Sequence, residues 1–397
     1  MEARCRIILV AGARPNFIKI APIARALSRE PGVFSPILVH TGQHYDAEMS
    51  DVFFDQLGIP RPDFNLQVGS GSHARQTAAV MTGFEDVLLK TKPNLILVVG
   101  DVNSTLACAV AAAKLRVPVA HVEAGLRSFD RSMPEEINRV LTDQISDWLF
   151  VTESAAEANL AKEGIDPARV HFVGNVMIDT LLSCREHARR LGIPAALGLG
   201  STPYAVLTLH RPHNVDERDV FEQIMQGIEH ISRDITIVFP MHPRTRQTLL
   251  GSHGAAALLD SGRLRLVEPL GYLEFLGLVE RSRVVLTDSG GVQEETTVLG
   301  VPCLTLRPNT ERPATVTEGT NRIVGTSANR IIEAWDAIKA TPPAPGRRPR
   351  LWDGRAAERI VEILRRDFEG ETISPGFDRV TESVTSKHVR RVGKLTG

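Results

Sequence analysis

Residues 6–27, RIILVAGARPNFIKIAPIARAL, decide the fold. An apolar run, Arg6–Val10, predicts a buried strand, and a turn at Gly12–Asn16 follows it. After the turn, apolar residues recur at helical spacing, so a helix with one buried face is expected. A strand, a tight glycine turn and an amphipathic helix in this order are typical of the first unit of a parallel α/β sheet.

The same alternation of strand and helix runs through most of the chain in two series. Further strands are expected, in chain order, at Pro36–His40, Leu95–Val99, Val119–Val122, Trp148–Val151, Val170–Val173, Ala205–Leu209, Ile235–Phe239, Leu264–Val267, Val284–Thr287 and Pro302–Leu306. Helices are expected at Thr105–Leu115, Glu135–Ile145, Ser154–Glu163, Ile178–Leu191 and Arg355–Phe368. The sequence therefore predicts an α/β protein with two Rossmann-like, doubly wound parallel sheets that face each other across a cleft.

The expected domain boundary lies where the first series of strands ends. Residues 1–175 are assigned to an N-terminal Rossmann-like domain and residues 176–368 to a C-terminal one. The tail, residues 369–397, has few large apolar side chains. Two alternatives stay open for this tail: it crosses back onto the N-terminal domain, or it is disordered.

The bulk composition excludes several classes of partner. The 397 residues carry a formal net charge of -1, with 43% hydrophobic and 23% charged residues, so nothing global favours nucleic acid or an anionic membrane. No apolar run approaches the roughly 20 residues of a membrane span, and no secretory signal pattern is visible. The four cysteines are scattered without a CxxC pair, which favours buried thiols over a metal site. A cytoplasmic protein that uses no metal and no cofactor is expected.

Polar clusters of the first half lie where predicted strands end. Arg14 and Lys19 accompany the Gly12–Asn16 turn, and the free N–H groups of a helix start favour an anion there. The competing interpretation is an ordinary strand-to-helix turn with two solvated cations. Spacing alone does not decide between the two, because the turn is neither a GxGxxG nor a Walker loop.

Three carboxylates, Asp101, Glu123 and Glu135, lie near strand ends of one predicted sheet. Two of them have structural explanations when taken singly. Asp101 can cap a helix, and Glu135, in the first turn of a helix, can interact favourably with the helix dipole and with Arg139 one turn further on. Gathered in one cleft, like charges raise some pKa values, which prepares carboxylates to act as acids or bases near neutral pH. The cluster therefore favours proton transfer over metal-dependent hydrolysis.

Strand ends of the second half carry groups suited to anions. A His accompanies an Arg at residues 210–211 and again at residues 242–244. The stretch Thr287–Glu295, TDSGGVQEE, joins an apolar strand to a helix, so its serine and two glycines can offer hydroxyl and N–H donors to a diphosphate. Glu295, one turn into the helix, is placed to accept from both hydroxyls of a ribose. Residues 307–312 follow the next strand end and face the same cleft.

These motifs, taken in order, resemble those of the bacterial non-hydrolysing UDP-N-acetylglucosamine 2-epimerases. The resemblance runs from Ile7 to about Thr326. It rests on GARPNFIKIAP at residues 12–22, TGQH at 41–44, GDVNSTLA at 100–107, HVEAGLRS at 121–128, MPEEINR at 133–139, HR at 210–211, DSGGVQEE at 288–295 and TERPATVTEGT at 310–320. It implies the GT-B fold, in which two Rossmann-like domains hold the active site between them, and a homodimer is expected by the same resemblance.

The resemblance also implies a cofactor-free reaction on a UDP-sugar. The proton on C2 leaves, UDP leaves from C1 to give a 2-acetamidoglucal, and UDP then adds back with C2 inverted. By the matching motifs, the catalytic residues are Asp101, Glu123, Glu135 and His210. The residues expected to bind sugar, diphosphate, ribose and uracil are Arg14, Lys19, Arg139, Phe275, Ser289, Gly290, Glu295 and Arg312. A second UDP-N-acetylglucosamine, acting as activator, is expected at Gln43, His44, Arg75, Gln76, Arg211 and His242.

Two departures leave the substrate's C3 and C6 groups open. Asn16 stands where many relatives carry Glu, and residues 128–133 lack the tryptophan common in well-known members. Both are expected close to the sugar. An epimerase for a 2,3-diacetamido uronic acid or a deoxy-N-acetyl sugar on UDP is therefore an alternative, and a GT-B glycosyltransferase is the rival from another class. A non-catalytic UDP-sugar sensor would have little use for all three carboxylates.

Overall fold

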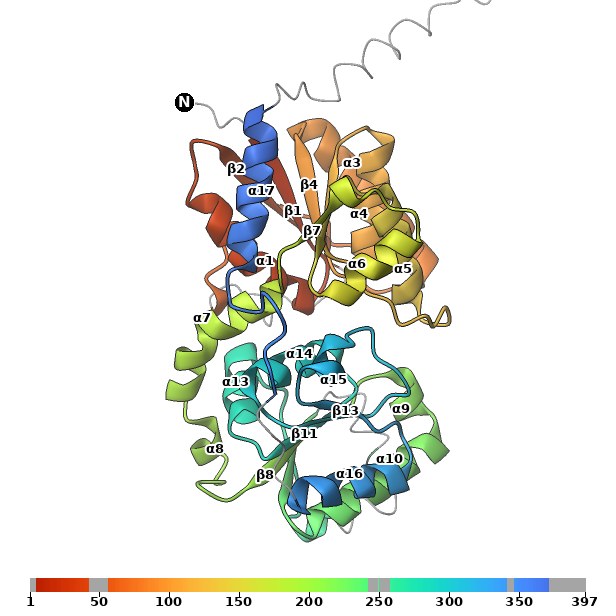
Figure 1. The fold of residues 1–397 in the computed structure, drawn as a ribbon, viewed down its shortest axis with the longest axis vertical. Coiled ribbons are helices and arrows are strands. Elements are labelled where there is room, and N and C mark those ends of the chain that lie inside the picture. The colour runs from red at the N-terminus through yellow and green to blue at the C-terminus, as the bar shows by residue number, and fades with distance from the viewer. Residues whose placement is uncertain (1–4, 43–55, 242–248, 250–257, 341–345, 371–397) are drawn as a thin grey trace, which may run out of the picture.

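The computed structural model describes residues 5–42, 56–241, 249, 258–340 and 346–370, which form two stacked α/β units (Figure 1). The first unit contains a seven-stranded sheet in the order β3-β2-β1-β4-β5-β6-β7, and every neighbouring pair is parallel. Its strands are β1 (Cys5–Ala11), β2 (Phe34–His40), β3 (Phe64–Asn65), β4 (Leu95–Val99), β5 (Val119–Ala124), β6 (Trp148–Val151) and β7 (Val170–Phe172).

The second unit contains a six-stranded parallel sheet in the order β10-β9-β8-β11-β12-β13. Its strands are β8 (Tyr204–Thr208), β9 (Thr236–Pro240), β10 (Leu264–Val267), β11 (Val284–Thr287), β12 (Cys303–Thr305) and β13 (Asn321–Ile323). Both sheets follow the doubly wound order 3-2-1-4-5-6, with β7 added at the edge of the first. The predicted fold class is confirmed, and the strand order reverses between β1 and β4 and between β8 and β11.

Helices cover both faces of each sheet (Figure 1). In the first unit they are α1 (Arg14–Ser28), α3 (His73–Thr91), α4 (Asn103–Lys114), α5 (Pro134–Ile145), α6 (Ser154–Lys162) and a 3-10 turn at Pro167–Arg169. The later helices are α7 (Val176–Arg190), α8 (Ile193–Ala196), α9 (Pro212–Asp216), α10 (Arg218–Ser232), α13 (Tyr272–Glu280), α14 (Gly290–Leu299), α15 (Ala314–Thr317), α16 (Ala328–Ala340) and α17 (Ala356–Gly370). Within the described residues, no helix is long and apolar enough to cross a membrane.

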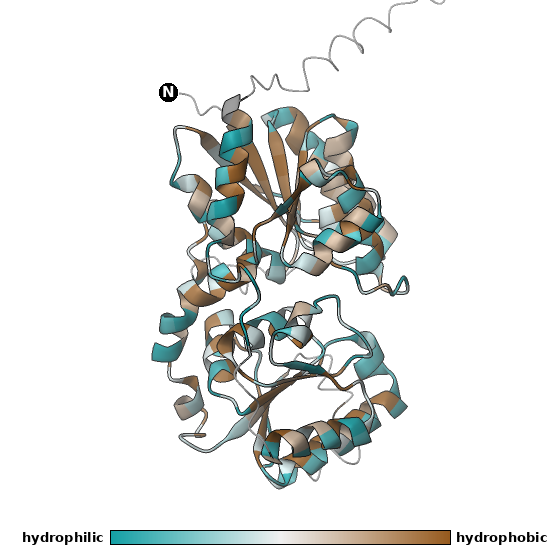
Figure 2. Ribbon diagram, in the orientation of Figure 1, coloured by the Kyte–Doolittle hydropathy of each residue, from teal (hydrophilic) through white to brown (hydrophobic). Residues whose placement is uncertain are grey.

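The central strands are buried on both faces, which is why they read as continuous apolar runs. In β1, Ile7 and Leu9 belong to the core beneath α1, whereas Ile8 and Val10 belong to the core beneath α3 and α4. Figure 2 shows the result as hydrophobic strands inside helices whose outer faces are hydrophilic. The strands β3 and β13, which the sequence does not predict, have only two and three residues and lie at sheet edges.

Helix α17 packs on the first unit, although the expected boundary assigned it to the second. Its apolar residues Ile360 and Leu364 share a buried cluster with Ile20 of α1. The indole Nε1 of Trp148 donates to Oδ2 of Asp367 at 2.9 Å, which ties the helix to β6. The chain therefore crosses back before residue 369, because the apolar face of this amphipathic helix is buried against α1 (Figure 1).

Candidate active site

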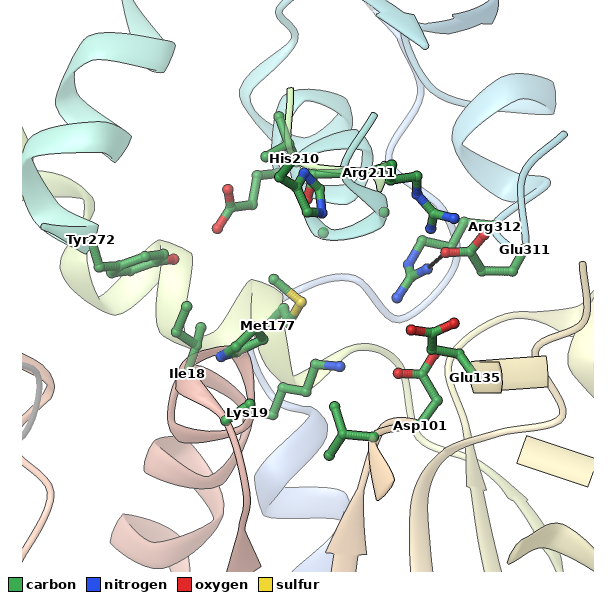
Figure 3. A pocket seen from close by; sticks show the side chains of 18 of the residues that line it. Ile18, Lys19, Asp101, Glu135, Met177, His210, Arg211, Tyr272, Glu311 and Arg312 are labelled. Atoms are coloured by element: carbon green, nitrogen blue, oxygen red, sulfur yellow. Dashed lines mark hydrogen bonds and ion pairs between the residues drawn. The ribbon is translucent and has the colours of Figure 1, made fainter. Parts of the chain in front are cut away.

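A cavity of about 430 Å³ lies between the two units, where the carboxyl ends of both sheets face each other. Figure 3 shows Lys19, Asp101 and Glu135 pointing into it from the first unit, while His210 and Arg312 face them from the second. The remaining lining residues are Ala13, Pro15, Ile18, Val102, Arg139, Met177, Arg211, Tyr272, Phe275, Ser289, Gly290, Gly291, Val292, Glu295 and Glu311.

The cavity brings together most of the residues that the sequence singled out. Those at its wall are Lys19, Asp101, Glu135, Arg139, His210, Arg211, Phe275, Ser289, Gly290, Glu295 and Arg312. Glu123 lies directly behind the wall, because it pairs with Lys19. The side chains of Arg14, Gln43, His44 and His242 lie outside the part of the chain that the structure describes.

Asp101 is fixed by Arg139. The guanidinium contacts Oδ2 of Asp101 through Nη2 at 2.7 Å and through Nε at 2.9 Å, and its Nη1 contacts Oε2 of Glu136 at 2.5 Å. Burial by itself would raise the pKa of Asp101, but the charges of Arg139 and Lys19 outweigh burial and hold that pKa below its ordinary value. Asp101 is therefore an ionised carboxylate at neutral pH.

Glu123 is held in an unusual backbone conformation. Its φ is 71°, and the pairing of β5 with β6 shifts register between Val122 and Ala124, so Glu123 is the extra residue of a β-bulge. Glu123 as a whole residue is 2% exposed, and its carboxylate contacts Nζ of Lys19 at 2.6 Å. Its other oxygen, Oε1, has no hydrogen-bond partner among the described residues. Backbone strain of this kind costs about 1–3 kcal/mol and clusters at functional sites.

Arg312 joins carboxylates of both units. Its guanidinium contacts Oε1 of Glu294 at 2.9 Å and Oε2 of Glu123 at 3.7 Å, and it also pairs with Glu311. Burial raises the pKa of Glu294 to about 7 despite the nearby Arg312. For Glu311, burial is outweighed by Arg312 and Arg307, so its pKa lies well below the ordinary range. Glu294 and Glu311 were not among the predicted site residues, although both occur in the quoted motifs.

His210 is oriented by Asp288, a third residue that was not among the predicted site residues. The Nδ1 atom of His210 lies 2.6 Å from Oδ1 of Asp288, and the backbone N–H groups of His210 and Arg211 donate to the same carboxylate. Burial opposes ionisation of Asp288, but His210 and these N–H groups hold its pKa below the ordinary value. A carboxylate bound at Nδ1 leaves Nε2 free for proton transfer or for contact with an anion.

The start of α14 forms the opposite wall of the cavity. Ser289 precedes its first turn, and the two glycines that follow allow close packing, since a Cβ on Gly290 would lie 2.5 Å from Nη1 of Arg312. Unpaired N–H groups at a helix start favour a phosphate. Burial raises the pKa of Glu295, one turn further on, to about 7. Among the described residues, no three His, Cys, Asp or Glu side chains gather as a metal-binding group.

Asn16 does not itself line the cavity. The side chain is 2% exposed, and its Oδ1 accepts from the backbone N–H groups of Gly12 and Ala13 at 3.1 and 2.8 Å. Its Nδ2 donates to the carbonyl of Val99 at 3.1 Å. Asn16 therefore stabilises the turn after β1 and joins it to β4.

A second pocket, of about 510 Å³, lies at the start of α3. Arg75 and Gln76 line it together with residues 68–72 and Ala79. Two of the residues expected to bind an activator therefore lie at this pocket, whereas Arg211 lines the interdomain cavity. Oε1 of Gln76 accepts from Asn103, and Asn138 bonds both Asn103 and the carbonyl of Asp101, so hydrogen bonds link the two regions.

Comparisons with known proteins agree with this geometry. A family model described as UDP-N-acetylglucosamine 2-epimerase matches residues 25–365. The chain belongs to the UDP-N-acetylglucosamine 2-epimerase family. A member from Methanocaldococcus jannaschii, named UDP-N-acetylglucosamine 2-epimerase, is 43% identical over 364 residues, covering 90% of this chain and 98% of its own. The Pseudomonas aeruginosa UDP-2,3-diacetamido-2,3-dideoxy-D-glucuronate 2-epimerase is also 43% identical over 364 residues, with 90% and 99% coverage.

The architecture of this epimerase agrees with that of solved family members. A crystal structure of the M. jannaschii UDP-GlcNAc 2-epimerase, in complex with UDP-GlcNAc and UDP, superimposes with a TM-score of 0.83 over 90% of this chain and 99% of that one. The GT-B arrangement of two Rossmann-like domains, which the resemblance implied, is thereby confirmed.

Proposed function

We propose that this enzyme reversibly converts UDP-N-acetylglucosamine to UDP-N-acetylmannosamine in the interdomain cavity. One observation carries the proposal: the carboxylates Asp101 and Glu135 face the start of α14 and Glu295 across a single cavity. The second unit offers donors suited to a diphosphate and a carboxylate suited to a ribose. The first unit offers proton-transferring groups, so the sugar would lie between the two sheets.

The reaction would proceed by loss of the C2 proton and departure of UDP from C1. Asp101 is ionised in the resting enzyme, so it would accept a proton or balance charge rather than donate a proton. Glu123 and Glu135 are the other two candidates for the base and the acid. The start of α14 would stabilise the charge that develops on the departing diphosphate, and Nε2 of His210 would contact or protonate it. A proton would then be delivered to the opposite face of C2 while UDP adds back to C1 with its configuration unchanged, which completes the epimerisation.

The nucleotide would occupy the second unit. Ser289 and Gly290 would donate to the diphosphate, Glu295 would accept from the ribose hydroxyls, and Phe275 would contact the uracil. Lys19 and Arg139 would bind the sugar and phosphate while also pairing with Glu123 and Asp101. Arg14 is assigned with them on the resemblance alone.

A 2,3-diacetamido uronic acid carried on UDP is the second candidate substrate. The P. aeruginosa relative named for that substrate matches this chain as well as the M. jannaschii enzyme does, at 43% identity over 364 residues each. The two substrates share UDP and the C2 chemistry and differ at C3 and C6. The catalytic groups would therefore serve either sugar.

The pocket at the start of α3 would be a regulatory site. A second UDP-N-acetylglucosamine would act as activator at Arg75, Gln76 and Arg211, with Gln43, His44 and His242, which lie outside the described residues. The pocket of about 510 Å³ beside Arg75 supports this assignment. We also propose that the protein is cytoplasmic and, following the resemblance, that it forms a homodimer.

Proton NMR in deuterated water, with purified protein and no acceptor, tests the proposed reaction. With UDP-N-acetylglucosamine, deuterium should enter C2 as a UDP-N-acetylmannosamine signal grows. If deuterium enters C2 of a UDP-2,3-diacetamido uronate but not C2 of UDP-N-acetylglucosamine, the second candidate substrate is the correct one. If neither sugar exchanges its C2 proton, the epimerase proposal is wrong.

A further inference from the structure

A buried polar cluster behind the cavity is not used by the mechanism above. It comprises His121 on β5, Asp143 on α5, Arg127 and Glu163. His121 and Asp143 are both fully buried, at 0% exposure. Arg127 contacts Asp143 at 2.7 Å and Glu163 at 2.7 Å, so the cation lies between two carboxylates. Removing such charges from water costs several kcal/mol per ion, and a buried ion pair is weak evidence of a stabilising role.

Both ring nitrogens of His121 face oxygen atoms that accept hydrogen bonds. Nδ1 lies 2.6 Å from Oδ1 of Asp143, and Nε2 lies 2.8 Å from the carbonyl oxygen of Gly100. Burial opposes ionisation of Asp143, but His121 and Arg127 hold its pKa below the ordinary value, so it accepts as a carboxylate. Both ring nitrogens of His121 are therefore held by acceptor oxygens, one on α5 and one on the turn after β4.

The contact between Nε2 of His121 and the carbonyl oxygen of Gly100 fixes the peptide bond that leads into Asp101. Gly100 has a φ of 67°, and its carbonyl, which accepts from His121, belongs to the peptide joining it to Asp101. Its own N–H donates to the carbonyl of Val122 at 3.0 Å. The turn that directs Asp101 into the cavity is therefore fixed by two residues of β5, His121 and Val122.

The contact between His121 and Asp143 holds the bulge at Glu123 from both sides. His121 precedes Glu123 by two residues, and Gly125, two residues after it, donates its N–H to Oδ2 of Asp143 at 3.0 Å. The carbonyl of Gly125 accepts from Asn159 at 3.0 Å. The carboxylate of Asp143 thus contacts the strand on both sides of Glu123, the residue with a φ of 71°.

We propose that the His121–Asp143 pair is a positioning device that aims the carboxylates of Asp101 and Glu123 at the reacting sugar. The inference rests on the proposed function and adds residues that never touch substrate. A misplacement of about 1 Å in a reacting group lowers turnover about 10²-fold. Binding of UDP depends on α14 in the other unit, so the pair acts on kcat and leaves UDP affinity unchanged.

Two substitutions of His121 separate the contacts. In His121→Asn the amide nitrogen replaces Nδ1 and keeps the bond to Asp143, but the bond to Gly100 is lost. In His121→Gln the amide nitrogen replaces Nε2 and reaches Gly100. Ser146→Ala is the matched control, because it removes a buried hydrogen bond of α5, from Oγ to the carbonyl of Thr142 at 2.7 Å, without touching either turn. For all variants kcat, KM, the UDP Kd and the Tm are measured.

We expect kcat to fall about 10²-fold in His121→Asn and less in His121→Gln, with KM and the UDP Kd within about threefold of wild type. Ser146→Ala should keep wild-type kcat. The inference is overturned if kcat of His121→Asn stays within about twofold of wild type, if KM and Kd worsen in parallel with kcat, or if Ser146→Ala loses as much at a similar Tm.

Crystal structures of wild type and His121→Asn give a readout that does not depend on turnover. We expect the carboxyl groups of Asp101 and Glu123 to shift by about 1 Å. If wild type exchanges no C2 proton, the proposed function fails, and these structures still decide the positioning claim. Carboxyl groups that stay in place overturn it.

Discussion

Replacing Glu123 by Gln tests the central acid of the site. The substitution keeps the shape of the side chain and removes the charge that pairs with Lys19 at 2.6 Å, where the two side chains are 1% and 7% exposed. At an effective dielectric of about 20, that separation corresponds to about 6 kcal/mol of Coulomb attraction, which desolvation largely offsets. Removing one partner of a buried pair nevertheless costs about 3–5 kcal/mol, because the other charge stays buried.

The low end of that range is expected for Glu123→Gln. The amide oxygen can still accept from Lys19, so about 3 kcal/mol of stability should be lost, measured as a shift in denaturant midpoint. Loss of a positioned acid or base lowers turnover about 10²–10⁴-fold. UDP affinity should be unchanged, because Ser289, Gly290 and Glu295 all belong to α14 and its cap.

The assays are C2 deuterium exchange for turnover and calorimetry for UDP binding. Asp147→Asn is the control, since it removes a carboxylate at the opposite end of β5, where Oδ2 accepts from the N–H of Val119 at 2.9 Å. The control should keep turnover. The assignment of Glu123 is refuted if its variant turns over within about tenfold of wild type, or if it loses UDP binding together with turnover.

Burial and the charge of Glu294 raise the pKa of Glu153 from 4.5 to about 7, so its stabilising contribution is complete below pH 4.5 and is lost as pH rises through 7. Glu153→Gln should therefore have the same free energy of unfolding as wild type near pH 4.5 and be more stable at pH 8, by on the order of 3 kcal/mol. Denaturant unfolding measures this difference, and equal denaturant midpoints at pH 8 contradict the raised pKa. Gly290→Ala places a Cβ 2.5 Å from Nη1 of Arg312 and should weaken UDP binding about tenfold, so an unchanged calorimetric Kd counts against α14 as the diphosphate site. Arg75→Ala should abolish activation by UDP-N-acetylglucosamine in the reverse reaction while retaining basal turnover, and an unaltered activation curve would remove the second pocket from regulation.

The sequence by itself determined most of the strands and their order along the chain. The bounds expected for Leu95–Val99, Trp148–Val151, Leu264–Val267 and Val284–Thr287 coincide with β4, β6, β10 and β11. Apolar periodicity and glycine turns are local properties, so they can be read along the chain without knowing what packs against it. The parallel alternation then places strand ends at one edge of each sheet, which is why the expected site residues reach one cavity.

Only the tertiary structure decided the partners of those residues. Lys19 meets Glu123 across 104 residues of chain, and the backbone N–H of His210 meets Asp288 across 78. The left-handed φ of Glu123, the pairing of Arg312 with Glu294 and the return of α17 to the first unit have no local signal. The hydrogen-bond partners of Asn16, which are backbone groups of its own turn and of β4, also become visible only in the folded chain. Burial, pKa and strain depend on neighbours brought together from distant parts of the chain, and those neighbours exist only once both sheets have formed.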